Sequence, residues 1–201
     1  LIYNTNFSKT TFKDIDVFEL WNKFDSDSVG ASLDAEGARG ELMRKGTVWE
    51  ETVANRKRMM EVCPQVDFYI SATVGLVNSL HVTDFHKSWV EQGLIKPADF
   101  NFNLLQHPIW QRMDILPPEF KEQVKKKYEE HILWLKDKDP LTRATKGFES
   151  GINWMLEKDN QKHLDLHIEQ TKKYDKMRNE QTLDVFPEWK ELFDKYDKNK
   201  T

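Results

Sequence analysis

Val29-Gly30-Ala31-Ser32-Leu33 is a short run of apolar and small residues that ends at Asp34. Such a run is typical of a strand that is buried in a parallel sheet. A second apolar run, Phe68 to Val74, lies further along the chain and is followed by Asn78. Parallel α/β sheets bind their ligands at the carboxyl ends of the strands, so the polar residues that follow these runs are candidate ligand contacts.

The first half of the chain alternates between strand-like and helix-like segments. Val17, Leu20, Trp21 and Phe24, for example, recur at the spacing of one helical face. We expect strands at residues 1–6, 29–33, 68–74 and 100–105, and helices at residues 17–24, 47–62 and 82–93. This alternation predicts right-handed βαβ units and a parallel sheet.

Two local features of this half lead to narrower expectations. The segment 35–46 carries three glycines and two arginines, and we expect it to be a long βα loop. Thr47-Val48-Trp49-Glu50 has the spacing of a capping box, which predicts a helix start there.

Beyond Pro108 the hydrophobic period becomes helical throughout. Four amphipathic helices are expected, around residues 120–132, 148–156, 164–171 and 189–196, with Pro187 suited to the first turn of the last one. We place a domain boundary at Pro117-Pro118, between a sheet-containing part (1–116) and a helical C-terminal extension (117–201).

Composition narrows the function classes. Charged residues make up 32% of the chain and the net charge is −4, without a basic patch, so neither nucleic acid nor a membrane is an expected partner and a cytoplasmic location is expected. Cys63 is the single cysteine, which excludes an internal disulfide and any cysteine-based metal site made by this chain alone. The chain opens without Met inside an apolar stretch, so we expect it to be part of a longer protein.

Four short motifs occur in a recognisable order over residues 1–107. They are Thr5-Asn6, Ser32-Leu33-Asp34, the pair Arg44 and Gly46, and Thr73-Val74 with Asn78. This order resembles the third to sixth strands of the radical S-adenosylmethionine (SAM) family, in particular its SPASM/twitch branch.

The resemblance implies an α/β fold, namely part of a (β/α)₆ partial TIM-type barrel (parallel strands three to six) followed by an all-α extension. It also implies an enzyme, active when full length, that binds SAM and a [4Fe–4S] cluster and generates a 5′-deoxyadenosyl radical for hydrogen abstraction. A peptide or protein is the expected substrate, and the cluster needs an electron donor. The family's CxxxCxxC ligands are expected upstream of Leu1, so we expect the 201-residue chain alone to be inactive.

The resemblance also assigns roles to single residues. Ser32 would contact the polar end or ribose of SAM, and Arg44 would pair with its carboxylate, which a guanidinium can grip with two hydrogen bonds. Asn78 would reach the ribose hydroxyls or the methionyl group. Thr5, Asn6 and Asp34 complete the expected cofactor site.

Each assignment has an alternative. Ser32 is also compatible with close helix packing, and Asn78 with a turn. Arg44 is equally suited to pair with Glu41 or Glu50 at the surface, and Asp34 to organise its loop through Asx-type hydrogen bonds.

Two further alternatives remain, one for a pair of histidines and one for the chain as a whole. His163 and His167 have the spacing of metal ligands on a helix, but without a third ligand we expect a solvated or partly packed pair and no metal. For the whole chain, the alternative to an enzyme is a non-catalytic α/β module whose C-terminal helices dock a partner protein.

Overall fold

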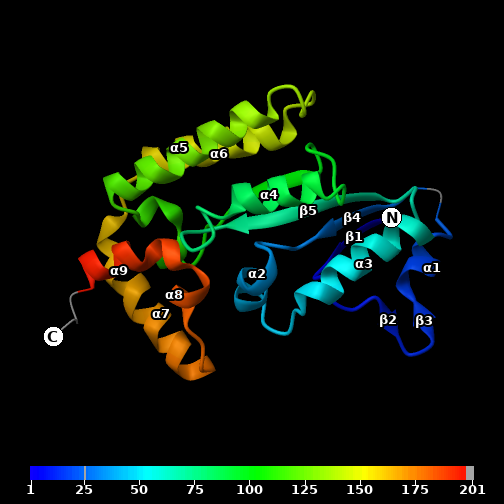
Figure 1. Ribbon diagram of the computed structural model, residues 1–201, viewed down its shortest axis with the longest axis horizontal. Coiled ribbons are helices and arrows are strands. Elements are labelled where there is room, and N and C mark those ends of the chain that lie inside the picture. The colour runs from blue at the N-terminus through cyan, green and yellow to red at the C-terminus, as the bar shows by residue number, and fades with distance from the viewer. Residues whose placement is uncertain (25, 198–201) are drawn as a thin grey trace.

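The computed structural model describes residues 1–24 and 26–197, and it confirms an α/β protein with a parallel sheet. The sheet has four strands in the order β1-β4-β5-β6, all parallel to their neighbours. Figure 1 shows the sheet near the middle of the molecule, with the C-terminal helices at one end. The strands are β1 (Ile2–Thr5), β4 (Ser28–Ala31), β5 (Asp67–Val74) and β6 (Phe100–Leu104).

Helices occupy the connections between these strands, as expected for βαβ units. They are α1 (Val17–Trp21), α2 (Gly37–Met43), α3 (Trp49–Val62) and α4 (Val82–Glu91). A small hairpin of β2 (Thr11–Phe12) and β3 (Ile15–Asp16) precedes α1 and was not expected from the sequence.

The expectation of a long loop at 35–46 is wrong, because α2 lies within it. Gly40 explains how a glycine-rich segment forms a packed helix. A Cβ added there would lie 2.7 Å from the carbonyl oxygen of Ala35 and 3.1 Å from the ring of Trp49. The missing side chain therefore lets α2 lie close against the start of α3, and this tertiary contact outweighs the low helix propensity of glycine.

The capping box at the start of α3 is also not observed. Val48 occupies the N-cap position and makes no side-chain cap bond. Instead, the backbone N–H of Trp49 donates to Oε1 of Glu41 at 2.7 Å. The helix start is thus capped by a carboxylate from α2, which the local sequence pattern does not reveal.

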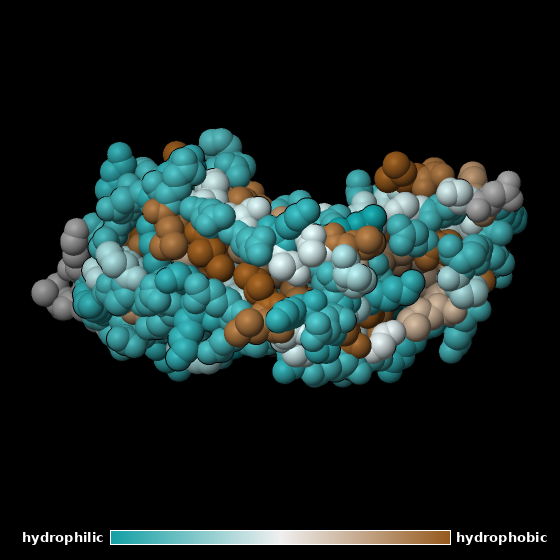
Figure 2. Space-filling view, turned by 90° about the horizontal axis from the view of Figure 1, so that it is seen from above, coloured by the Kyte–Doolittle hydropathy of each residue, from teal (hydrophilic) through white to brown (hydrophobic). Residues whose placement is uncertain are grey.

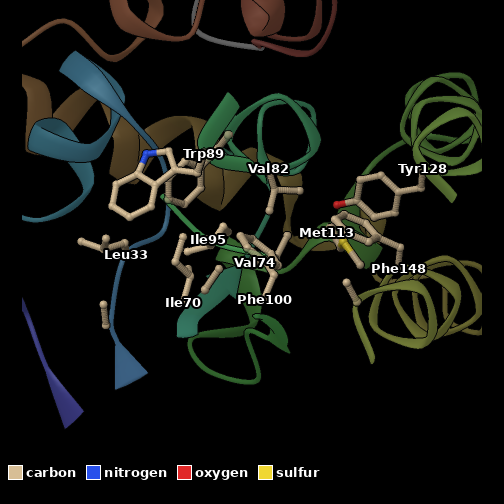
Figure 3. Packing of buried hydrophobic residues seen from close by; sticks show 14 of the residues in the cluster. Leu33, Ile70, Val74, Val82, Trp89, Ile95, Phe100, Met113, Tyr128 and Phe148 are labelled. Atoms are coloured by element: carbon tan, nitrogen blue, oxygen red, sulfur yellow. The ribbon is translucent and has the colours of Figure 1, made fainter. Parts of the chain in front are cut away.

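The two faces of the sheet differ in chemistry. On one face Phe68, Ile70, Ala72 and Val74 alternate along β5 as buried side chains, and Figure 3 shows Ile70 and Val74 close to side chains of α4 and β6. The opposite face carries polar side chains that are exposed or half-buried, and Nδ2 of Asn103 on β6 donates to Oγ of Ser71 on β5 at 3.0 Å.

Helices make up all the regular structure of the described residues after 117. A hairpin of α5 (Pro118–Leu135) and α6 (Arg143–Glu157) packs against α4 and β6, and shorter helices follow it. These are α7 (Leu164–Arg178), α8 (Thr182–Val185) and α9 (Lys190–Tyr196), with 3₁₀ turns η3 (Gln161–His163) and η4 (Pro187–Trp189). Two more 3₁₀ turns, η1 (Ile109–Gln111) and η2 (Met113–Ile115), link β6 to α5.

One hydrophobic cluster runs across the predicted domain boundary at 117. Phe102 on β6 contacts the rings of Tyr128 and Phe148, which lie on α5 and α6. Gly147 and Gly151 make room for this contact, since a Cβ at Gly147 would lie 2.7 Å from Cβ of Phe102. The helical hairpin therefore shares its core with the sheet, and the boundary stays a prediction.

The surface is mostly hydrophilic. Figure 2 shows hydrophobic residues gathered in a band across the middle of one face and in a smaller group towards the right-hand end of the view. Within residues 1–24 and 26–197, no helix combines the length and the apolar character that crossing a membrane requires.

Candidate functional site

Three of the predicted site residues meet at the carboxyl ends of β1 and β4. Nε of Arg44, which directly follows α2, lies 2.8 Å from Oδ2 of Asp34. Nη1 of the same guanidinium donates to Oδ1 of Asn6 at 3.3 Å. Asp34 also accepts from the backbone N–H of Thr73 at the end of β5, at 2.8 Å. Residues from three strand ends thus converge on one charged pair, which the sequence could suggest only by its motif order.

The pairing of Arg44 with Glu41 or Glu50 does not appear. Glu41 caps α3 instead, and Asp34 is the carboxylate beside Arg44. The side chain of Arg44 is 26% exposed and that of Asp34 is 10% exposed, so the pair lies at a partly open edge rather than in the core. A guanidinium carries five N–H donors, so the contacts with Asp34 and Asn6 leave donors that can take a second carboxylate.

Thr5 and Ser32 lie side by side at the same edge. The backbone N–H of Ser32 donates to the carbonyl oxygen of Thr5 at 2.8 Å, which extends the β1–β4 ladder by one step. Oγ1 of Thr5 accepts from the backbone N–H of Phe7 and so shapes the turn that follows β1. Ser32 is half-buried. In the sequence it directly follows the last residue of β4 and precedes Asp34 by two positions.

Asn78 is fully buried, and both the oxygen and the nitrogen of its side-chain amide form hydrogen bonds. Oδ1 accepts from the N–H of Gly75 at 2.9 Å, and Nδ2 donates to the carbonyl oxygens of Asp34 and Thr73 at 2.8 and 3.0 Å. These bonds tie the turn after β5 to the turn after β4. They favour the turn role for Asn78, and its contact with a cofactor stays a prediction.

A cavity of about 270 Å³ opens at this strand-end edge. Its sheet side includes Asp34, Thr73 and Asn78, and its opposite side comes from the C-terminal helices. One face of α7 contributes to it, with His167, Thr171 and Tyr174 at helical spacing. The cavity therefore brings Asp34 of the charged pair next to the helical extension, whereas Arg44 is not among the residues that line it.

His167 is a residue whose role the sequence interpretation missed. The pair of His163 and His167 was expected to be solvated or partly packed, but His167 is 1% exposed, while His163 lies in η3 and is half-buried. Nδ1 of His167 lies 3.0 Å from the carbonyl oxygen of Trp110, and burial lowers its pKa to about 4. The signal that could have pointed to it is the repeat His167, Thr171, Tyr174 and Arg178 on one helical face.

Cys63 lies apart from this edge. It occupies the C-cap of α3, is 1% exposed, and burial raises the pKa of its thiol. One thiol does not fit a [4Fe–4S] cluster, which needs several thiolates. Within the described ranges 1–24 and 26–197, no set of three or more His, Cys, Asp or Glu side chains is arranged to hold a metal ion.

Comparison with known proteins adds no assignment. No family model matches the chain, and no curated protein or solved structure matches it.

Proposed function

We propose that this chain is part of a radical SAM enzyme and that its strand-end edge binds the amino-acid end of SAM. The observation that carries the proposal is the juxtaposition of Arg44 and Asp34 at 2.8 Å. The amino-acid end of SAM is a zwitterion with a carboxylate and an ammonium group on one carbon. A guanidinium and a carboxylate held side by side are complementary to this pair of charges.

In this proposal each residue binds one part of the cofactor. Arg44 donates its remaining N–H groups to the SAM carboxylate, and Asp34 accepts from the SAM ammonium group. Ser32 and Asn6 supply neutral polar groups at the same edge, and Thr5 shapes the turn that carries Asn6. Asn78 holds the β4 and β5 turns at a fixed separation and so positions Asp34. In the complete enzyme, bound SAM would supply the 5′-deoxyadenosyl radical for hydrogen abstraction on receiving one electron from a [4Fe–4S] cluster that is held outside these residues.

The open polar face of the sheet supports the partial-barrel part of the proposal. Parallel sheets of doubly wound proteins are covered by helices on both faces. Here the face with Asn4, Ser71, Asn101 and Asn103 is polar and exposed or half-buried, as the lining of a wide, ligand-holding barrel would be. β1 is an edge strand with exposed apolar side chains, including Ile2, which suits further strands on that side.

This chain by itself cannot hold the [4Fe–4S] cluster. Cys63 cannot supply the thiolates, so the proposal requires the cluster ligands to come from outside these 201 residues. It follows that the chain by itself binds SAM without turning it over. An electron donor and a peptide or protein substrate belong to the complete enzyme in this proposal.

The alternative, a binding module that docks a partner through its C-terminal helices, has less support. The apolar stripes that suggested it are largely used within the chain. Phe148 on α6, Trp189 at the end of η4 and Leu192 on α9 are each at most 1% exposed and belong to the common core.

The test is a calorimetric titration of SAM into the 201-residue chain. We expect binding, and we expect Arg44→Ala to weaken it by roughly 1.5–3 kcal/mol because the carboxylate loses a charge-assisted partner. Exposed Arg143 on α6 gives a matched control, and Arg143→Ala should leave the affinity unchanged. Decarboxylated SAM should bind the wild type and Arg44→Ala equally. No SAM binding by the wild type would contradict the proposal, and equal SAM binding by Arg44→Ala would contradict the role of Arg44.

A further inference from the structure

Charged side chains contribute to the lining of the strand-end cavity. They are Asp34, Asp175, Arg178 and Glu180. Two of the carboxylates are paired with cations that lie outside the lining. Nε of Arg44 lies 2.8 Å from Oδ2 of Asp34, and Nζ of Lys45 pairs with Oε1 of Glu180. The chain itself therefore neutralises these two carboxylates.

Asp175 and Arg178 differ from the other two charged residues of the lining. The carboxylate oxygens of Asp175 accept from the hydroxyl and the backbone N–H of Thr182, at 2.6 and 3.0 Å, and both donors are neutral. The guanidinium carbon of Arg178 lies 5.2 Å from the centroid of the Tyr174 ring. In the part of the chain that the structure describes, neither Asp175 nor Arg178 forms an ion pair. Their two opposite charges are therefore available to a ligand.

The position of these two residues on α7 makes the missing ion pair informative. They lie three residues apart, so their side chains are neighbours on the helix surface, where an aspartate and an arginine commonly attract each other. Here Thr182 holds the carboxylate and Tyr174 lies beside the guanidinium. The carboxylate keeps free lone pairs and the guanidinium keeps its N–H donors. Asp175 is half-buried and Arg178 is exposed, so a ligand can reach both.

The rest of the lining indicates the size and polarity of the ligand. The ring of Trp110 lies 6.1 Å from that of Tyr174, and Leu76 and Leu105 add aliphatic surface to the same cavity. Such walls favour an apolar group. The cavity volume of about 270 Å³ lies just below the range of about 300–1,000 Å³ that is usual for small-molecule sites. The ligand is therefore small, with an apolar part and two opposite charges that lie close together.

We propose that this cavity binds a free α-amino acid with an apolar side chain. Arg178 donates to its carboxylate, Asp175 accepts from its ammonium group, and the apolar lining holds its side chain. A free amino acid carries both charges on one carbon, whereas a residue inside a peptide carries neither. The ligand is therefore distinct from the peptide or protein substrate of the proposed function. The inference goes beyond that function, which makes no use of Asp175 or Arg178.

The experiment compares three probes that share one branched apolar end. L-leucine carries both charges, isopentylamine lacks the carboxylate, and isocaproate lacks the ammonium group. Each is titrated into the 201-residue chain, and binding is followed by ligand-observed NMR. We expect leucine to bind about tenfold more tightly than either of the other probes, because each of these loses one charge-assisted contact. No binding of leucine, or equal binding of leucine and either other probe, would overturn the proposal.

Variants assign each charge to its residue. Arg178→Met removes the guanidinium and keeps an aliphatic chain, so it should weaken leucine about tenfold and leave isopentylamine unchanged. Asp175→Asn removes the negative charge, so it should weaken leucine and leave isocaproate unchanged. Lys176→Met is the matched control, because Lys176 is exposed in the same turn of α7, and it should bind all three probes as the wild type does. Unchanged leucine affinity in Arg178→Met contradicts the inference.

Arg44→Ala separates this site from the proposed SAM site, since SAM has an amino-acid end of its own. We expect Arg44→Ala to bind leucine. Leucine binding that is lost in Arg44→Ala and kept in Arg178→Met would place the amino acid beside Arg44 and overturn the inference. A wild-type chain that binds leucine but not SAM would contradict the proposed function alone, so the two failures are distinguishable.

Discussion

Nδ1 of His86 lies 2.9 Å from Nε2 of His131, and this hydrogen bond between two buried imidazoles joins α4 to α5. Nε2 of His86 lies 3.0 Å from the carbonyl oxygen of Pro97, which can only accept. Nε2 of His86 is therefore protonated, its Nδ1 is the acceptor, and Nε2 of His131 is the donor. A further proton on Nδ1 of His86 would remove the acceptor and break the link between the sheet-side helix and the helical hairpin.

This geometry predicts that the protein loses stability in mild acid. Burial lowers the pKa of both rings below the ordinary value of 6.5, to about 4 for His86. Between those pH values the unfolded chain binds more protons than the folded one, so the free energy of unfolding falls as the pH falls. We expect a loss of roughly 2–3 kcal/mol for His86 between pH 7 and pH 4, seen as a decrease of the melting temperature.

His131→Gln separates this effect from general acid denaturation. The amide of glutamine can replace the Nε2 donor of His131 without a titrating ring. We expect the melting temperature of this variant to depend less steeply on pH between 6.5 and 4 than that of the wild type. His107 is exposed, and His107→Gln should keep the wild-type slope. Identical slopes for the two variants would contradict the role of the buried pair.

Asn78→Ala should destabilise the fold strongly. The substitution leaves the N–H of Gly75 and the carbonyl oxygens of Asp34 and Thr73 without their partner in a buried place. We expect a loss of about 2–4 kcal/mol in the free energy of unfolding, measured by urea denaturation. Asn101 is exposed on β6, and Asn101→Ala should change the stability by less than about 0.5 kcal/mol. A near-neutral Asn78→Ala would show that the turn does not need the amide.

Arg39 connects α2 to the C-terminal segment. Its Nε donates to the carbonyl oxygen of Val185 at 2.9 Å, its Nη2 lies 2.9 Å from Oε2 of Glu188, and its Nη1 donates to Nδ1 of His81 at 2.6 Å. A lysine has one ammonium group and cannot make all three contacts. Arg39→Lys should therefore increase amide hydrogen exchange in α8 and η4.

The control for this variant is Arg178→Lys, because Arg178 is exposed and contacts the ring of Tyr174. In Arg178→Lys, the rate of amide hydrogen exchange in α8 and η4 should match that of the wild type. Unchanged protection of α8 and η4 in Arg39→Lys would show that the segment is held by its apolar contacts alone.

The β1 edge should promote self-association. Ile2 is 78% exposed on a strand that pairs on one side with β4, so both backbone groups and an apolar side chain are available to a second copy. Ile2→Lys should shift the chain towards monomer in sedimentation velocity, since a charged edge side chain opposes strand pairing. Exposed Leu133 on α5 offers the matched control, and Leu133→Lys should leave the association unchanged. A wild-type chain that sediments as a monomer at all concentrations would contradict this prediction.

The sequence determined the elements whose pattern is local. The alternation of apolar residues along Phe68–Val74 and the helical period of α4 to α7 reflect the side-chain periodicity of each backbone, so strands and helices could be located before any contact was known. The predictions that failed concern structure that depends on contacts between distant residues. Whether residues 35–46 form a loop or a helix depends on how closely Gly40 approaches Ala35 and Trp49, and that distance is a property of the packed molecule.

The site was only partly within reach of the sequence. The motif order predicted that Asn6, Asp34 and Arg44 belong together, because consecutive parallel strands bring their carboxyl ends to one edge. The sequence did not reveal which carboxylate pairs with Arg44, because the choice of Asp34 over Glu41 or Glu50 depends on distances across the sheet. The same holds for Asn78, whose amide forms hydrogen bonds to two turns. Only the tertiary structure placed α7 against the strand ends and buried Nε2 of His167 without a hydrogen-bond partner. Contacts between segments about 90 residues apart depend on how the whole chain packs and not on any local pattern.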